Sequence, residues 1–297
     1  MKRNTITLVA LLAVLLVIAY LVMQRSGERS TSGAGALLVH IDSVAVDRLE
    51  IQSPKSRLVL EKRGVDWYMK EPIDYRADQT AVANLIHDAK TLEIKSVVSN
   101  KPGKFPVFQV DTISGTRFTV YEKGSKAAEL IIGKVGGAYT DLYVRKLSSD
   151  DVNAVDPPIS YQMNRAAKDW RDKTIITTAK ESIKEIKYQY GDTTFTLAYK
   201  DSVWVVGNNT VKTEDVNGVL STLSNFQADD FIDSTISPAP KISALISYAG
   251  NQLRFSYLKP QNKYAVQSSN SPQWFVVENW KTNSILKRKK DFVKTGK

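Results

Sequence analysis

The sequence predicts an α+β fold: an N-terminal transmembrane helix followed by two duplicated modules, each a mostly antiparallel sheet with a packed helix. Three observations support this class. Residues 6–23 form an uncharged apolar run, one segment returns after a constant offset of 134 residues, and short alternating segments separated by turn residues surround each copy.

The repeat joins VANLIHDAKTLEIKSVV, residues 82–98, to VNGVLSTLSNFQADDFI, residues 216–232. The apolar positions that recur are Val82, Leu85, Ile86, Ala89, Leu92, Val97 and Val98, matched by Val216, Val219, Leu220, Leu223, Phe226, Phe231 and Ile232. The first four have the i, i+3, i+4, i+7 spacing that places apolar side chains on one face of a helix. Each copy therefore predicts an amphipathic helix followed by a strand.

The first module is predicted to begin with strands. Val46–Ile51 is the first, and residues 57–62 and 66–70 form a hairpin. Asp78 or Thr80 can cap the helix that contains the first copy of the repeat. The elements expected after this helix are strands at 94–99, 117–122, 128–133 and 141–146, then a short helix around 149–155.

The second module is predicted to repeat this order. Trp67 and Trp204 occupy the third strand of each module, and residues 117–120 (RFTV) resemble residues 254–257 (RFSY). The expected strands are 183–190, 193–199, 202–206, 228–233, 243–248, 252–258, 262–267 and 273–277, with helices at 213–226 and near 280–290. The ordered match favours two copies of one module.

These patterns predict the organisation of the whole chain. The expected parts are a cytoplasmic N-terminus at 1–5, a transmembrane anchor at 6–23, a stalk at 24–43, a first repeat at 44–156, a connector at 157–182, a second repeat at 183–293 and a tail at 294–297. The Ser/Gly-rich sequence QRSGERSTSGAGA predicts that the stalk is flexible.

The uncharged run predicts a single membrane span. Its 18 residues would extend about 27 Å as a helix, close to the roughly 30 Å of a bilayer core. The alternative, a cleaved signal peptide, has a shorter apolar core and a small-residue cleavage site directly behind it. Lys2 and Arg3 favour a cytoplasmic N-terminus and an extracytoplasmic body. The anchor residues expected to contact lipid are Ile6, Leu11, Leu15, Ile18 and Met23.

The charge distribution argues against a nucleic-acid partner. The formal net charge is +10, of which residues 1–29 supply +3 and residues 280–297 supply +6, so the body between them is nearly neutral. The chain has no cysteine, which excludes a lipid-modified cysteine and is compatible with an oxidising envelope.

The sequence contains no recognisable catalytic or cofactor constellation. Residues 132–137 (IGKVGG) lack the order of a phosphate-binding loop and predict a hairpin turn. His40 and His87 have no cysteine to complete a zinc site. The acidic residues within 229–233 lack the spacing of a calcium loop and are typical of a charged strand edge. We therefore expect no enzymatic activity, no metal and no cofactor.

The segment Trp170-Arg171-Asp172-Lys173 is the candidate partner-binding site. It lies between the modules and combines an aromatic side chain with charges of both signs, as protein interfaces often do. The alternative is a structural role, in which Trp170 fills the seam between the modules and Arg171 pairs with Asp172.

Two further groups have a structural and a functional interpretation. Trp67, Trp204 and Trp274 lie on predicted strands, where core packing is favoured over stacking on sugar rings. The basic residues Lys287–Lys290 complement the dipole at a helix C-terminus, and we hypothesise that they also contact anionic lipid headgroups.

Five motifs occur in order along the body. They are Asp66-Trp67-Tyr68-Met69-Lys70-Glu71-Pro72, Ala77-Asp78 at a helix start, Phe108-Gln109-Val110-Asp111, Ile132-Gly133-Lys134 and Trp170-Arg171-Asp172-Lys173. Over residues 44–293 the chain resembles a bacterial envelope family catalogued as domain-of-unknown-function family 4340. That family often has Gly where this chain has Gln109. The resemblance implies a membrane-anchored protein, often encoded beside ABC-type transport and gliding-motility components, and implies no catalytic residue.

Sequence and resemblance together predict a non-catalytic scaffold or auxiliary subunit of an ABC-type transport system. One helix would anchor it in the bacterial inner membrane, with its body in the periplasm. Two alternatives stay open. One is a cell-envelope glycan-binding or glycan-processing protein that uses a cleft between the modules. The other is a sensor whose modules move about Pro157-Pro158 when a ligand binds.

Overall fold

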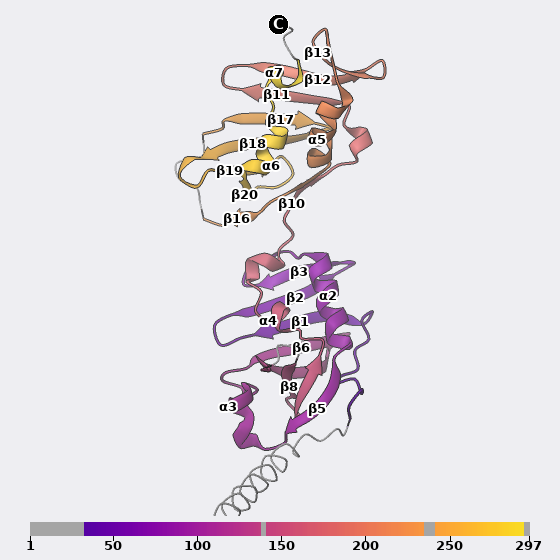
Figure 1. Ribbon diagram of the computed structural model, residues 1–297, viewed down its shortest axis with the longest axis vertical. Helices are drawn as coiled ribbons and strands as arrows, with labels where there is room; N and C mark the ends of the chain where they lie inside the picture. Colours follow the sequence, from indigo (N-terminus) through magenta and orange to yellow (C-terminus); the bar gives the residue numbers. More distant parts are fainter. Residues whose placement is uncertain (1–32, 138–140, 235–240, 294–297) are drawn as a thin grey trace, which may run out of the picture. The chain divides into compact units, whose positions relative to one another are not determined.

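The computed structural model describes residues 33–137, 141–234 and 241–293, and the chain divides into two compact units between Asp172 and Lys173 (Figure 1). The predicted anchor at 6–23, with its five lipid-facing residues, and the tail at 294–297 lie outside the described residues. Within the described ranges, no helix is long and apolar enough to cross a membrane.

The first unit is built on a nine-stranded antiparallel sheet in the order β4-β3-β2-β1-β6-β7-β8-β9-β5. Its strands are β1 (Val46–Gln52), β2 (Arg57–Arg63), β3 (Asp66–Glu71), β4 (Tyr75–Arg76), β5 (Glu93–Ser99), β6 (Thr116–Glu122), β7 (Ser125–Val135), β8 (Leu142–Lys146) and β9 (Val152–Asp156). Its helices are α2 (Gln79–Lys90), α3 (Phe105–Phe108) and α4 (Ser160–Met163), with short 3₁₀ turns η1 (Pro102–Lys104) and η2 (Ala167–Trp170).

Helix α2 covers one face of this sheet, as Figure 1 shows. Its buried residues, among them Val82 and Leu85, belong to the same apolar cluster as Leu49 of β1 and Leu60 of β2. Because side chains alternate along a strand, the residues between these core positions point to the opposite face. One face of the sheet is thus the core of the unit, and the other carries mainly polar and charged side chains.

The second unit is built on another nine-stranded antiparallel sheet, in the order β14-β13-β12-β11-β17-β18-β19-β20-β16. Its strands are β11 (Glu185–Tyr190), β12 (Thr194–Lys200), β13 (Val203–Val206), β14 (Asn209–Val211), β16 (Asp230–Ile232), β17 (Ala244–Tyr248), β18 (Asn251–Leu258), β19 (Lys263–Ser268) and β20 (Trp274–Glu278). Beside the sheet, β10 (Thr174–Thr177) pairs with β15 (Asn225–Gln227). The helices are α5 (Thr213–Ser224), α6 (Asn279–Ile285) and α7 (Lys289–Phe292), with 3₁₀ turns η3 (Lys180–Ser182) and η4 (Lys259–Gln261).

Taken in chain order, the strands β1 to β9 of the first sheet correspond to β11 to β14 and β16 to β20 of the second. Corresponding strands hold the same place in the two sheets. Helices α2 and α5 begin and end 134 residues apart, which is the offset of the sequence repeat. Corresponding helix positions are equally buried: Val82 and Val216 are both 0% exposed, and Leu92 and Phe226 are at most 1% exposed. The two predicted sheet-and-helix modules are therefore confirmed, although each consists mostly of β-structure with a few short helices.

The short helix predicted around 149–155 is wrong, because this segment forms β9. Val152 and Val155 are completely buried, and their strand pairs with β8 on one side and β5 on the other. The sequence match between residues 117–120 and 254–257 also has no topological basis. It relates β6 to β18, whereas the counterpart of β6 in the second sheet is β17. The terminal helix predicted near 280–290 is divided into α6 and α7.

The segment before β1 is part of the first unit. The backbone N–H of Leu38 donates to the carbonyl of Leu92 at 2.7 Å, and that of Gly35 donates to Ile94 at 2.8 Å. Leu38, which the sequence analysis assigned to the stalk, is 1% exposed. Strand β10 makes the matching contact with β15 in the second unit. In each unit, the chain that precedes the sheet thus pairs with the backbone that follows the packed helix.

The start of α2 is stabilised by Asp78, whose carboxylate accepts a hydrogen bond from the backbone N–H of Ala81 at 3.0 Å. The equivalent residue before α5 is Lys212, which makes no such cap. We predict that Asp78→Ala lowers the free energy of unfolding by about 1 kcal/mol. The matched control Lys212→Ala should leave it nearly unchanged, because it removes no cap. Urea denaturation of both variants checks the difference, and equal effects would contradict the capping role.

Candidate functional site

In the first unit, the sheet face opposite α2 carries charges that pair with one another. Arg48 and Glu50 of β1 lie 2.5 Å apart, and Arg57 of β2 lies 3.6 Å from Glu50. Further ion pairs join Lys70 to Glu61 at 3.4 Å, Arg117 to Glu129 at 3.7 Å and Lys126 to Glu129 at 2.7 Å. Three of these partly exposed pairs, those of Glu50 with Arg57, Lys70 with Glu61 and Arg117 with Glu129, link neighbouring strands, and the other two lie within β1 and β7. The pairs satisfy one another's charge, so this face has little charge left for a ligand.

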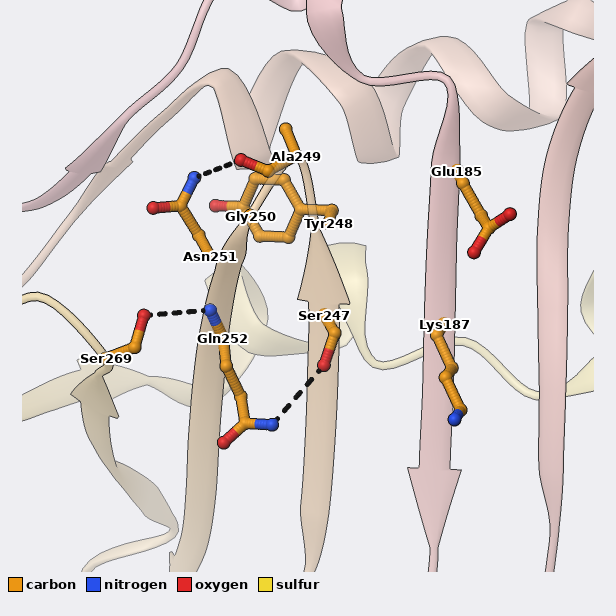
Figure 2. A pocket seen from close by; sticks show the side chains of 9 residues that line it. All are labelled: Glu185, Lys187, Ser247, Tyr248, Ala249, Gly250, Asn251, Gln252 and Ser269. Atoms are coloured by element: carbon orange, nitrogen blue, oxygen red, sulfur yellow. Dashed lines mark hydrogen bonds between the residues drawn. The ribbon is translucent and has the colours of Figure 1, made fainter.

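The corresponding face of the second unit is polar but less fully paired. Lys187 of β11 is opposite Ser247 of β17, which is opposite Gln252 of β18. Figure 2 shows these side chains, with Glu185 on the same side of β11, around a shallow depression of about 480 Å³. The Gln252 amide donates to the Ser247 hydroxyl at 3.4 Å, and the Gln252 backbone N–H donates to the Ser269 hydroxyl at 3.1 Å.

Three charged side chains on this face form no ion pair with any other described residue. They are Glu185 and Lys187 of β11 and Arg254 of β18, and all three are exposed. We call this surface, made by Glu185, Lys187, Ser247, Gln252 and Arg254, the open polar face. Small-molecule pockets are usually enclosed and largely apolar, whereas this depression is shallow and lined by charged, hydroxyl and amide groups. Its shape and chemistry suit the polar surface of a macromolecule.

The structure places Trp170, Arg171 and Asp172 of the predicted partner-binding segment in the first unit and Lys173 in the second. Trp170 is 0% exposed, belongs to the apolar core of that unit, and accepts a hydrogen bond at its carbonyl from the backbone N–H of Asp78 at 2.8 Å. Arg171 is 2% exposed, and its guanidinium stacks over the ring of Tyr75 at 4.3 Å. The two side chains that were expected to offer a docking surface are thus packed in the interior.

The remaining residues of that segment are partly exposed. The Asp172 carboxylate pairs with the Arg76 guanidinium, and the Asp172 backbone N–H donates to the Arg76 carbonyl at 2.9 Å. The carbonyl of Lys173 accepts a hydrogen bond from Ala228 at 2.8 Å within the second unit. A partner that contacts this segment would therefore reach Asp172 and Lys173, not Trp170 or Arg171.

Two of the sequence motifs pack against each other in the first unit. A carbon added as Cβ to Gly133 of β7 would lie 2.3 Å from the carbonyl oxygen of Phe108, so only glycine fits at this position. Arg145 of β8, 6% exposed, donates to the carbonyl of Val110 at 3.0 Å and stacks on Phe105 at 4.2 Å. Burial lowers the pKa of the Arg145 guanidinium. We call residues 102–115 the flap, because this segment lies over one end of the polar face of the sheet.

The flap accounts for the glycine and lysine of residues 132–137. Ile132–Val135 is the end of strand β7, with a register shift at this point, and the chain turns only after it. The segment therefore opens no helix and cannot present convergent backbone N–H groups to a phosphate. Strands β7 and β8 pair antiparallel, and Gly133 lies within β7, where it serves the contact with the flap.

Gln109 has the left-handed backbone conformation, with φ of 57°, at the C-terminal end of α3. This conformation costs a non-glycine residue about 1 kcal/mol or more. We predict that Gln109→Gly raises the free energy of unfolding by about 1 kcal/mol, measured by urea denaturation. Thr112→Gly, at an exposed flap position without positive φ, should instead lower stability, since glycine there only adds freedom to the unfolded chain. A loss of stability in both variants would refute this account of Gln109.

The flap also contains a pH-sensitive carboxylate. Hydrogen bonds from the hydroxyl and backbone N–H of Ser114 and from the backbone N–H of Ile113 lower the pKa of Asp111 below its ordinary 3.8. The ionised Asp111 carboxylate therefore stabilises the fold fully above its ordinary pKa of 3.8. This stabilisation is lost as the pH falls through the lower pKa of Asp111 in the folded protein. We predict that Asp111→Asn destabilises the protein at pH 6 and that the difference from wild type shrinks towards pH 2. Denaturant midpoints across this range test it; a constant difference would be inconsistent with the linkage.

The other candidate residues are two histidines and the acidic cluster at 229–233. His40 and His87 are exposed, and among the described residues no group of three or more His, Cys, Asp or Glu could hold a metal ion. Asp229 accepts from Lys281 at 2.5 Å and from the backbone N–H of Glu278 at 2.8 Å. The acidic cluster at 229–233 therefore includes at least one carboxylate that is engaged within the second unit.

The tryptophans on strands behave largely as expected. Trp67 and Trp204 are 7% and 5% exposed, and Trp274 is half-buried. Trp280, the second residue of α6, is 70% exposed. It was not among the candidate residues identified from the sequence. Its position directly after a predicted strand, at the start of a helix, was the only signal that could have distinguished it.

The comparison with known families agrees with the motifs described above. Residues 67–244 match the family described as Domain of unknown function (DUF4340). The chain belongs to this family. The matched region runs from β3 of the first unit to the start of β17 in the second, so it includes the flap, both packed helices and the segment around Trp170. No curated protein and no solved structure matches the chain.

The residues of the open polar face were also missed at the level of sequence. The alternation of residues 183–190 predicts a strand with Glu185 and Lys187 on one face, but it does not show what lies beside them. Their grouping with Ser247 and Gln252 depends on the pairing of β11 with β17 and of β17 with β18.

Proposed function

We propose that this DUF4340 protein is a non-catalytic scaffold, anchored in the bacterial inner membrane by residues 6–23, whose periplasmic body binds a protein partner. The partner is an ABC-type transporter component, as the family resemblance implies. The protein would hold or orient this component on the outer side of the membrane, without transforming a substrate.

The observation that carries this proposal is the open polar face of the second unit. Its exposed Lys187 and Arg254 have no ionic partner among the described residues, and hydroxyl and amide groups lie beside them. On the same face of the first unit, ion pairs join neighbouring strands. Because the two units share one fold, this difference in charge pairing supports binding by the second unit and a structural role for the first.

A partner on this face would contribute acidic and hydrogen-bonding groups. Lys187 and Arg254 would meet carboxylates, and Ser247 and Gln252 would exchange hydrogen bonds with polar side chains or backbone. Charge complementarity of this kind sets specificity and association rate more than affinity. The ion pairs would be weakened by salt.

A second candidate function is glycan binding at the cell envelope, which the exposed ring of Trp280 favours. Aromatic rings offer flat apolar surfaces against which sugar rings can pack. This function does not compete for the same surface, because Trp280 is not part of the open polar face.

In-cell photo-crosslinking tests the proposed partner surface. A photoreactive benzoylphenylalanine would replace Gln252 in the full-length protein, and adducts would be identified by mass spectrometry. We expect an ABC-type membrane component to be captured, with capture about tenfold lower in the Lys187→Glu, Arg254→Glu background because two attractive contacts become repulsive.

The control places the same photoreactive residue at Asn217, which is exposed on α5. Capture of one protein from both positions would indicate non-specific labelling and would count against the proposal. Recovery of no protein from position 252, or of glycan fragments alone, would overturn it.

A further inference from the structure

One end of the second sheet carries exposed aromatic rings. Trp280 is 70% exposed and Tyr257 is 43% exposed, whereas tryptophan is on average a highly buried residue. Tyr257 packs against the half-buried ring of Tyr264, with centroids 5.2 Å apart. In the antiparallel sheet, the end of β18, the start of β19 and the end of β20 lie at the same end. The end of β18, which carries Tyr257, and the start of α6, which carries Trp280, are therefore at the same end of the sheet.

The carboxamide of Asn262 joins Tyr257 to the first residue of α6. The Tyr257 hydroxyl donates to the Oδ1 atom of Asn262 at 2.9 Å, and the Asn279 amide donates to the same oxygen at 3.2 Å. Asn262 follows η4 in the left-handed conformation, with φ of 52°. Amide groups with further donor and acceptor capacity therefore lie beside Tyr257 and at the start of α6, the helix that carries Trp280.

Three acidic residues near this end are paired with basic side chains, and the Asp291 carboxylate accepts a hydrogen bond from the backbone N–H of Arg288 at 2.7 Å. Glu278 lies 2.7 Å from Lys263, Asp229 lies 2.5 Å from Lys281, and Asp192 lies 2.7 Å from Arg288. Lys259, Lys287, Lys289 and Lys290 form no ion pair with another described residue. Arg288 stacks on Tyr190, the last residue of β11, at 3.8 Å, which brings the basic segment to the same end of the sheet. The excess charge here is therefore positive.

We propose that this end of the second unit, made by Tyr257, Asn262, Asn279, Trp280 and the basic residues Lys259 and Lys287–Lys290, binds an acidic polysaccharide. The rings of Trp280 and Tyr257 stack on sugar rings, the two carboxamides hydrogen-bond with sugar hydroxyls, and the lysines meet carboxylate groups on the polymer. This proposal relies on the periplasmic location in the proposed function, but not on the transporter partner.

The combination of groups favours a polysaccharide over other ligands. A neutral protein surface would leave four lysines without partners, and a small anion would not use the exposed rings. An anionic lipid surface would use both the rings and the lysines, but it has little need for a hydrogen-bonded pair of carboxamides beside Tyr257. A binding experiment with acidic and neutral sugars and with lipids separates these ligands.

The experiment uses the full-length protein in nanodiscs of zwitterionic phosphatidylcholine, with no partner protein present. The probes are an oligogalacturonate of about ten sugars and the neutral sugar chitohexaose, with binding followed by isothermal titration calorimetry. We expect the acidic oligosaccharide to bind, and Trp280→Ala to weaken this binding at least about tenfold. Because Trp280 is exposed, its replacement should leave the melting temperature unchanged.

A matched control and a charge variant complete the test. Tyr161→Ala, which removes a 78% exposed aromatic side chain from the first unit, should not alter binding. Lys289→Gln combined with Lys290→Gln should weaken binding of the acidic oligosaccharide, as 0.5 M NaCl should, and leave any weaker binding of chitohexaose unchanged.

Three results would overturn the proposal. These are no oligogalacturonate binding at 1 mM, equal binding by wild type and Trp280→Ala, or displacement of the oligosaccharide by nanodiscs that contain phosphatidylglycerol, which would identify the surface as a lipid site. Failure here would leave the transporter partner untouched. Failure of the crosslinking at position 252, with oligogalacturonate binding intact, would leave only the glycan function.

Discussion

Burial of one apolar helix stripe against one sheet face is the interaction on which the rest of each unit depends. In the first unit, Val82 and Leu85 pack with Leu49 and Leu60, and this contact decides which alternate residues of every strand face the core. In the second unit, Val216 and Leu223 are buried in the same way. A shift of one residue in any central strand would exchange the two faces, so the packed helix also specifies the register of the sheet.

Once one face is committed to the core, the other face is free to differ between the units. The first unit uses it for ion pairs between neighbouring strands and covers part of it with the flap, held by Arg145 and by the close contact at Gly133. The second unit keeps Lys187 and Arg254 without ionic partners within the described part of the chain. Two copies of one fold thus differ in their polar faces: ion pairs and the flap occupy this face in the first unit, and exposed charged side chains without ionic partners among the described residues occupy it in the second.

The family motifs belong mainly to the architecture of the first unit. Phe108 and Gly133 form one contact, Gln109 supplies the left-handed turn, and Trp170 fills the core beside Asp78. In this structure these motifs make contacts within the fold, so they do not by themselves locate a ligand site. The groups better placed to meet a ligand, such as Lys187 and Trp280, lie outside these motifs, on exposed positions of the second unit.

The sequence by itself determined the properties that depend on near neighbours. The apolar spacing predicted both helices and their common offset, alternation and turn residues predicted most strands, and Asp78 was recognised as one of two possible caps. Tertiary structure alone decided what depends on distant residues. Residues 152–156 became a strand because β8 and β5 enclose them, Trp170 became a core residue because α2 and β3 surround it, and Trp280 stayed exposed because nothing in the described structure covers it. Periodicity reports which face of an element is apolar, whereas strand order and coverage of a face are set by pairings between segments far apart in the chain.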